Sequence, residues 1–268
     1  MVTLFGVRID AIGQERLEQT LTHWLDQVSR HTIFTPNPEF LLTARKDRAF
    51  AELLNQSSLS LPDGIGLRFA ASALGQERIE ERVTGVDTLL LCARVCARKK
   101  KRLLLLGGAD LVAERAALAL KTQMADLEVV AMNPGELSGS FQTVAVSKTV
   151  WDNVRGHQPD VIAVALGQGK QERFCLDALE QVPTLHIAMA IGGALDMVSG
   201  RRARCPHWMR RSGFEWVWRV LIEPSRIRRI WRAVIVFPLT VAWDTLRFRR
   251  FWKAVRSVFH EIISVWTR

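Results

Sequence analysis

The chain contains no tyrosine, few cysteines and no hydrophobic run long enough to cross a bilayer. None of its four cysteines forms a C-x-x-C pair or has a histidine at zinc-ligand spacing, so we expect reduced thiols, partly in the core, and no metal site. The longest uncharged apolar run, Ala233 to Trp243, contains Pro238 and is shorter than the roughly 20 residues of a spanning helix. The N-terminal segment, Met1 to Asp10, has no signal-peptide hydrophobic region, and its pattern predicts a strand.

Three common phosphate-binding signatures are also missing. The segment Leu106–Asp110 follows an expected strand but does not match G-x-G-x-x-G. Gly169-Lys170 is similar to the end of a P-loop, but Gln171 stands where serine or threonine is needed, and no glycine lies five residues before Gly169. The chain has no Asp-x-Asp, the usual metal clamp on a sugar nucleotide. We therefore expect no cofactor, and a bound diphosphate would be neutralised by arginines or backbone N–H groups.

The positive charge is concentrated in the last quarter of the chain. The net charge is +10, and residues 201–268 contain sixteen Lys/Arg against four Asp/Glu, together with seven of the nine tryptophans. Such a segment predicts an anionic partner, either nucleic acid or an anionic lipid surface. The abundance of tryptophan favours lipid, because tryptophan prefers the headgroup boundary.

The hydrophobic pattern predicts an α/β fold with a mostly parallel, Rossmann-like sheet and helices on both faces. Helices, the first over Gln14–Val28, separate apolar segments that we expect to be strands. These segments are Val2–Ile9, Thr32–Thr35, Leu59–Leu61, Lys101–Leu106, Leu127–Met132, Val161–Leu166 and Leu185–Ala190. Ligands bind at the carboxyl ends of such strands. The loops at residues 35–37, 62–64, 107–108, 167–170 and 191–193 should therefore form one composite site.

The composition changes near residue 200. We therefore predict an α/β catalytic domain over residues 1–200 and a C-terminal helical membrane-binding appendage over residues 201–268. A helical wheel from Phe248 to Trp266 places the apolar side chains on one stripe and Arg249, Arg250 and Lys253 on the other side. This basic amphipathic helix either contacts the membrane or packs on its own domain or on a sister subunit.

Asp63 is the carboxylate best placed for chemistry, because it follows a strand and precedes a glycine. It could accept a proton from an attacking hydroxyl, or it could simply form a turn. Thr35 and Asn37 at another strand end are binding groups or turn residues. Arg82 is a ligand for an anion or a solvated charge, and Gln171 with Glu172 either binds a ligand or caps a helix.

Seven segments in order resemble the WecG/TagA/CpsF glycosyltransferase family over roughly residues 2–230. They are Thr35–Glu39, Leu61–Gly66, Arg82–Asp87, Leu166–Glu172, Gly192–Asp196, Gly200–Met209 and, taken together, Gly213–Trp216 with Arg219 and Glu223–Arg226. The resemblance implies an inverting, metal-independent enzyme that transfers N-acetylmannosamine or its uronic acid. The donor is a UDP-sugar, and the acceptor is a polyprenyl-diphosphate-linked GlcNAc used in bacterial surface polysaccharide synthesis. It implies peripheral attachment to the cytoplasmic face of the membrane, with possible homo-oligomers and no nucleic-acid partner.

The resemblance also suggests roles for individual residues. Asp63 resembles the general base, and Thr35, Asn37, Arg82 and Gln171 resemble pocket residues. We expect further substrate contacts from glycines at strand ends and from C-terminal arginines near the diphosphate, namely Gly107, Gly192, Gly193, Arg204, Arg219, Arg226 and Arg229.

The sequence departs from the family pattern at several positions, including Gly169 in place of proline and Phe174 in place of tryptophan, which leaves the sugar specificity open. Two other functional classes remain as alternatives. A non-catalytic nucleic-acid-binding protein would use the basic C-terminal region. An NAD-dependent oxidoreductase is disfavoured by the missing fingerprint.

Overall fold

A computed structural model of the protein describes the chain except residues 136, 207–208, 210–214, 225–226, 248–249 and 267–268. Its centre is a six-stranded sheet in the order β4-β3-β8-β7-β5-β6, in which every neighbouring pair is parallel. The strands are β3 (His31–Phe34), β4 (Leu59–Ser60), β5 (Leu103–Gly107), β6 (Val129–Met132), β7 (Val161–Ala165) and β8 (Ile187–Ala190). The predicted parallel sheet is confirmed.

Helices cover both faces of the sheet because successive strand residues point to opposite sides. Leu104 and Leu106 belong to one buried cluster, and Leu103 and Leu105 belong to the other. The first cluster is covered by α2 (Pro38–Ala44), α3 (Arg48–Asn55), α4 (Ile65–Ala73), α7 (Lys148–Gly156) and α8 (Lys170–Gln181). The second is covered by α1 (Gln14–Asp26), α5 (Gly85–Lys99), α6 (Val112–Gln123) and α9 (Ala194–Val198). All four cysteines are buried and free, as the sequence predicted.

The prediction of one N-terminal strand over Val2–Ile9 was wrong. The segment is an antiparallel hairpin of β1 (Val2–Leu4) and β2 (Val7–Ile9), with Val2 opposite Ile9. Phe5 and Gly6 form the turn with φ angles of 49° and 80°. Both residues adopt the left-handed conformation that two-residue hairpin turns require, so the chain reverses in the middle of the apolar pattern.

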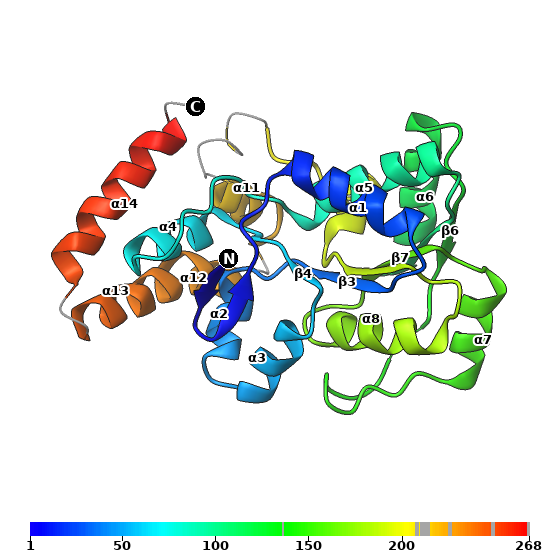
Figure 1. The fold of residues 1–268 in the computed structure, drawn as a ribbon, viewed down its shortest axis with the longest axis horizontal. Coiled ribbons are helices and arrows are strands. Elements are labelled where there is room, and N and C mark those ends of the chain that lie inside the picture. The colour runs from blue at the N-terminus through cyan, green and yellow to red at the C-terminus, as the bar shows by residue number, and fades with distance from the viewer. Residues whose placement is uncertain (136, 207–208, 210–214, 225–226, 248–249, 267–268) are drawn as a thin grey trace.

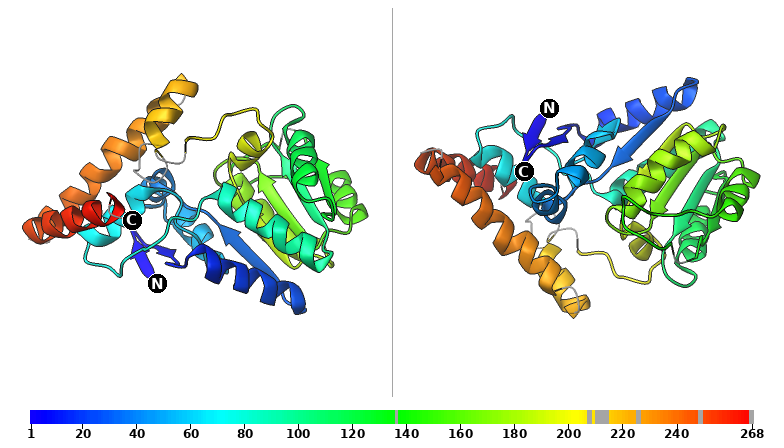
Figure 2. Two further views of the ribbon diagram at one scale, coloured as in Figure 1. Left: turned by 90° about the horizontal axis from the view of Figure 1, so that it is seen from above. Right: turned by 90° about the horizontal axis from the view of Figure 1, so that it is seen from below.

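The C-terminal quarter forms a run of helices on the side of the domain where α2, α4 and the hairpin lie, away from α6 and α7 (Figures 1 and 2). They are α11 (Glu215–Ile222), α12 (Ile227–Trp231), the π-helix η2 (Arg232–Val236), α13 (Phe237–Arg247) and α14 (Phe251–Trp266). The π-helix ends at Val236, two residues before Pro238, whose ring would crowd a carbonyl in a regular α-helix. Phe237 is buried in the same cluster as α4. Within the described residues, no helix has both the length and the apolar character needed to cross a membrane.

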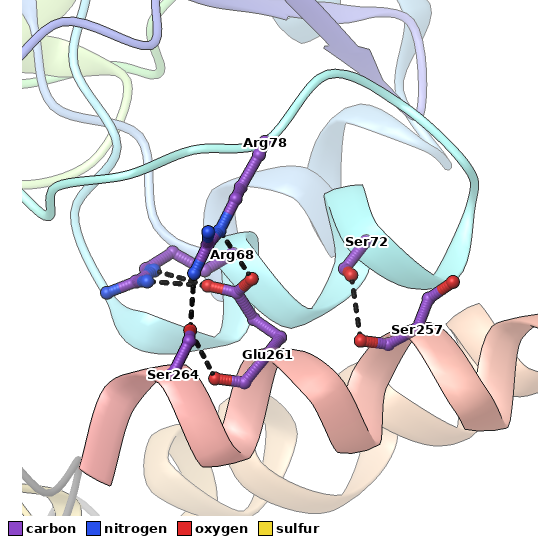
Figure 3. A network of polar contacts seen from close by, with 6 residues as sticks. All are labelled: Arg68, Ser72, Arg78, Ser257, Glu261 and Ser264. Atoms are coloured by element: carbon purple, nitrogen blue, oxygen red, sulfur yellow. Dashed lines mark hydrogen bonds and ion pairs between the residues drawn. The ribbon is translucent and has the colours of Figure 1, made fainter. Parts of the chain in front are cut away.

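Helix α14 packs on α4 through a narrow face that carries a buried acid (Figure 3). The Glu261 carboxylate, whose side chain is 4% exposed, accepts hydrogen bonds from Arg68 at 2.5 Å and from Arg78 at 2.8 Å. The Ser72 hydroxyl donates to the carbonyl of Ser257 at 3.2 Å. The buried charge is therefore matched by two guanidinium groups.

The wide apolar stripe of α14 faces away from the domain. Trp252, Phe259 and Trp266 are 77%, 62% and 65% exposed, whereas Ala254 and Val265 on the packed face are buried. The helix does pack on its own domain, one of the two expected arrangements, but of its apolar stripe within residues 251–266 only Val258 packs against the core, and most of the stripe stays exposed.

We predict that Glu261→Gln will lower the free energy of unfolding by about 2–4 kcal/mol, because it leaves Arg68 largely buried without a matching charge. Urea unfolding measures the effect. The matched control is Glu52→Gln, which breaks the exposed pair between Arg48 and Glu52 and should change stability by less than about 0.5 kcal/mol. Equal losses in the two variants would contradict the importance of the buried pair.

Candidate active site

The loops at the carboxyl edge of the sheet are joined to one another by hydrogen bonds. The N–H of Asp63, after β4, donates to the carbonyl of Pro36, after β3, at 3.0 Å. The Thr35 hydroxyl donates to the carbonyl of Ala190, at the end of β8, at 3.1 Å. The N–H of Val83 donates to the carbonyl of Pro62 at 3.2 Å and brings the segment before α5 to the same edge. The predicted convergence is thus observed for the loops at residues 35–37 and 62–64, and the segment at Val83 joins them.

Asp63 and Arg82 lie on neighbouring segments of this edge, and both are half-buried. Asp63 precedes Gly64, the N-terminal cap residue of α4, which has φ 119° and no side-chain cap. The open N-terminus of α4 favours a negative charge at Asp63. Arg82 immediately precedes Val83, which is bonded to the Asp63 loop.

Thr35 and Asn37 each have a structural contact. Thr35 is buried and joins the ends of β3 and β8. The Asn37 side-chain oxygen caps α2 by accepting from the N–H groups of Glu39 at 2.9 Å and Phe40 at 3.2 Å. Capping uses only this oxygen, so the NH2 group of Asn37 is not required for it.

The predicted contact Gly107 lies where backbones approach closely. It ends β5 with φ 98°, and a Cβ there would stand 2.6 Å from the carbonyl oxygen of Ala165 in β7. Only glycine fits such a position without displacing the backbone. The helices that follow β5 and β7, α6 and α8, cover opposite faces of the sheet. The junction of these two strand ends is therefore a topological switch point, the usual ligand position in such sheets.

Gln171 is buried and has both ends of its amide bonded within the protein. Its Nε2 donates to Glu172 at 2.6 Å, and its Oε1 accepts from the N–H of Gly192 at 3.2 Å. Glu172 also accepts from the N–H of Gly169 at 2.6 Å. Gln171 therefore connects the glycine loops after β7 and β8, which include the predicted contact Gly192.

Burial raises the pKa of Glu172 to about 7, although hydrogen bonds from Gln171 and from backbone N–H groups oppose the shift. Both carboxylate oxygens accept hydrogen bonds in the structure, which is the arrangement of the ionised form. A protonated Glu172 keeps an acceptor oxygen for the Gln171 amide, so the bonds that join the two loops do not depend on ionisation of Glu172.

The structure pairs two of the predicted C-terminal arginines, Arg204 and Arg229, with carboxylates at the same edge. Arg204 forms an ion pair with Asp87, which closes the capping box of α5 with Thr84. Arg229 bonds Glu39 of α2 at 2.8 Å. Gly193 is exposed and caps α9 without a side-chain bond. Arg219 belongs to α11, but its side chain lies outside what the structure describes, and Arg226 lies outside the described residues.

Sequence reasoning gave no role to Glu39 and Asp87, the carboxylates that hold Arg229 and Arg204. For Glu172 it left ligand binding and helix capping open, and Glu172 does accept from the N–H of Gly169 in the capping box of α8. The one signal available was the excess of arginine in the last quarter, which requires anionic partners somewhere in the chain. Within the described part of the chain, no group of three or more His, Cys, Asp and Glu is arranged to hold a metal ion. The groups at this edge that suit an anion are arginines and backbone N–H groups.

We predict that Glu172 makes wild-type stability fall as the pH rises from about 5 to 8. A carboxyl whose folded pKa is raised from 4.5 to about 7 holds its proton longer in the folded state, so its stabilising effect is complete below 4.5 and lost through 7. Urea unfolding at several pH values measures the free energy of unfolding. Over this pH range, that free energy should fall by about 3 kcal/mol less in Glu172→Gln than in the wild-type protein. Parallel curves for the two proteins would contradict the assignment.

Comparison with known proteins identifies the family. The family model described as Glycosyl transferase WecG/TagA/CpsF family matches residues 2–251. A Bacillus subtilis (strain 168) protein named N-acetylglucosaminyldiphosphoundecaprenol N-acetyl-beta-D-mannosaminyltransferase is 30% identical over 208 residues, which is 78% of either chain. A protein of the same name from Staphylococcus aureus (strain NCTC 8325 / PS 47) is 27% identical over 243 residues, 90% of this chain and 92% of that one. The chain therefore belongs to the WecG/TagA/CpsF family and is a glycosyltransferase.

Proposed function

We propose that the protein transfers N-acetylmannosamine from a UDP-linked donor to the GlcNAc of a polyprenyl-diphosphate-linked acceptor. The names of the two relatives supply the sugar and the acceptor class. The observation that carries the proposal is the carboxyl edge of the sheet, where the Asp63 loop is hydrogen-bonded to the segments of Asn37 and Arg82. A carboxylate, amide and guanidinium on adjoining segments suit deprotonation of a hydroxyl beside an anionic group.

The donor nucleotide fits best at the switch point between β5 and β7. Helix α6 begins there after Gly107-Gly108, and its cap residue Leu111 makes no side-chain cap bond, so the first-turn N–H groups of α6 are not taken up by a capping side chain. In contrast, α2 and α5 at the same edge are capped by Asn37 and Thr84. The diphosphate would thus meet the N-terminus of α6 and the guanidinium groups from the C-terminal helices.

In the proposed reaction, an acceptor hydroxyl attacks the anomeric carbon from the face opposite to the diphosphate. Asp63 takes the hydroxyl proton while the new carbon–oxygen bond forms and the bond to UDP breaks, which inverts the anomeric centre. The negative charge that develops on the leaving diphosphate is stabilised by arginines, for which Arg219, Arg226 and Arg229 are our candidates.

We predict that Asp63→Asn will cut turnover by about 100- to 10,000-fold, because the amide cannot accept the proton. The assay measures acceptor-dependent UDP release with UDP-N-acetylmannosamine and a short-chain prenyl-diphosphate-GlcNAc. Asp152→Asn is the control, because Asp152 lies on α7 in an exposed pair with Arg155 and should leave turnover unchanged. Near wild-type release by folded Asp63→Asn protein would refute Asp63 as the base. No release by wild-type protein with any UDP-sugar would refute the proposed function.

We further propose that the helices from residue 215 onward place the protein on an anionic membrane, where a polyprenyl-linked acceptor resides. Their exposed surface combines large apolar side chains with arginines. The exposed tryptophans are Trp216, Trp231, Trp243, Trp252 and Trp266, and exposed arginines include Arg228, Arg247, Arg250 and Arg256. This combination suits the headgroup region, where apolar rings insert and guanidinium groups meet lipid phosphates. Since α14 is held by Glu261, its apolar stripe is already turned outward.

We predict that replacing Trp252, Phe259 and Trp266 together by serine will weaken binding to anionic liposomes by at least about tenfold, because each ring loses apolar burial in the bilayer. Co-sedimentation with phosphatidylglycerol-containing liposomes measures the change. Leu118→Ser is the control, because Leu118 is equally exposed but lies on α6, far from the C-terminal helices. Unchanged co-sedimentation of the triple variant would exclude α14 as the contact surface.

A further inference from the structure

Glu39 joins the first turn of α2 to the arginine-rich helices of the C-terminal quarter. One carboxylate oxygen accepts from Nε of Arg229 at 2.8 Å, and the other lies 3.5 Å from Nη1 of Arg232. The Glu39 side chain is 12% exposed, whereas those of Arg229 and Arg232 are 48% and 42% exposed. The acid is therefore covered, and both guanidinium groups keep an open side.

The same turn of α2 adjoins the loop of the candidate base. The N–H of Glu39 donates to the side chain of Asn37, and the carbonyl of Pro36 accepts from the N–H of Asp63. A Cβ at Gly64 would stand 3.3 Å from the ring of Pro38, so the two segments are in van der Waals contact. Glu39 thus fixes the arginines relative to the Asp63 loop.

The charges in this cluster do not cancel. One carboxylate faces two guanidinium groups, which leaves an excess of one positive charge. Each arginine has five N–H donors, and the bonds to Glu39 use a single nitrogen of each. Most of the donors therefore remain for a further anion. The planar fork of arginine is suited to the oxygens of a phosphate group.

We propose that Glu39 is a positioning residue that holds Arg229 and Arg232 toward the diphosphate group of a substrate. The inference rests on the proposed function, because that reaction supplies the diphosphate. Glu39 itself need not touch the substrate or exchange a proton. Its contribution is to restrict two long, flexible side chains before the substrate binds, which reduces the ordering cost of binding.

The chain provides a matched control for a merely structural role. Asp244 of α13 pairs with Arg45, the C-terminal cap residue of α2. Its carboxylate accepts a hydrogen bond of 2.8 Å from Nη2 of Arg45. The Asp244 side chain is 14% exposed, close to the value for Glu39. Both ion pairs attach the C-terminal helices to α2. Only the Glu39 pair lies at the N-terminal end of α2, which adjoins Asp63.

The experiment compares Glu39→Gln with Asp244→Asn by thermal unfolding, UDP calorimetry and steady-state kinetics with each substrate varied. We expect similar small losses of stability, but a 10- to 100-fold lower kcat/KM in Glu39→Gln alone. Weaker UDP binding would assign the donor diphosphate to the arginines, whereas a raised KM for the prenyl diphosphate alone would assign the acceptor. Glu39→Gln should add no further loss to the double variant Arg229→Ala/Arg232→Ala, because Glu39 acts only through these two arginines.

The proposal is overturned if Glu39→Gln and Asp244→Asn match in UDP affinity, both KM values and kcat. Arg232→Gln is a second test that does not depend on the folding of the Glu39 variant, and unchanged kinetics in Arg232→Gln would remove Arg232 from the assignment. If wild-type protein shows no transfer with any donor, the proposed function fails. The UDP calorimetry of Glu39→Gln against Asp244→Asn then still tests Glu39 separately.

Discussion

Pairing between arginines and carboxylates fixes the position of the C-terminal quarter on the α/β domain. The pairs run in both directions: the body supplies Glu39 and Asp87 to C-terminal arginines, and the C-terminal helices supply Glu261 and Asp244 to arginines of the body. Such pairs add little net stability where they replace apolar packing, but a missing partner leaves a costly buried charge. These pairs therefore determine which arrangement of the C-terminal helices forms, and they add little to its stability. In that arrangement, guanidinium groups lie at the carboxyl edge of the sheet.

The same pairs link the exposed apolar stripe of α14, which is the proposed membrane contact, to the candidate base. Glu261 attaches α14 to Arg68 on α4, the helix that begins directly after the Asp63 loop. Its second partner, Arg78, precedes Arg82 by four residues on the segment that leads to α5. The apolar stripe of α14 and the Asp63 loop consequently belong to one packed unit. An enzyme whose acceptor is anchored in lipid needs this kind of fixed relation between its docking surface and its reacting groups.

The sheet and its edge were predictable because they depend on local patterns. Apolar runs between helices specify parallel strands, and parallel strands place their following loops on one side. Contacts with distant residues were not predictable. The face that α14 buries carries Glu261, and its burial is explained only by Arg68 and Arg78, nearly two hundred positions earlier. Gln171 was likewise predicted to be a pocket or capping residue, yet its amide connects the glycine loops after β7 and β8. The N-terminal hairpin was missed because Phe5 adopts a left-handed conformation, which few residues other than glycine do.

Helix capping differs along the carboxyl edge, although α6 on the side of β5 also has an acid, Glu114, in its first turn. On the side of β3 and β4, Asn37 and Thr84 occupy the N-termini of α2 and α5, and Glu39 and Asp87 add negative charge in their first turns. The N-terminus of α4 on that side has no capping side chain, but Asp63 stands directly before its cap residue Gly64. On the side of β5, the N-terminus of α6 has no capping side chain, and Gly107 allows close backbone approach. In the proposed reaction, the nucleotide diphosphate would therefore lie beside β5 and the hydroxyl to be deprotonated beside Asp63, so that transfer would run along the edge from β5 toward β4.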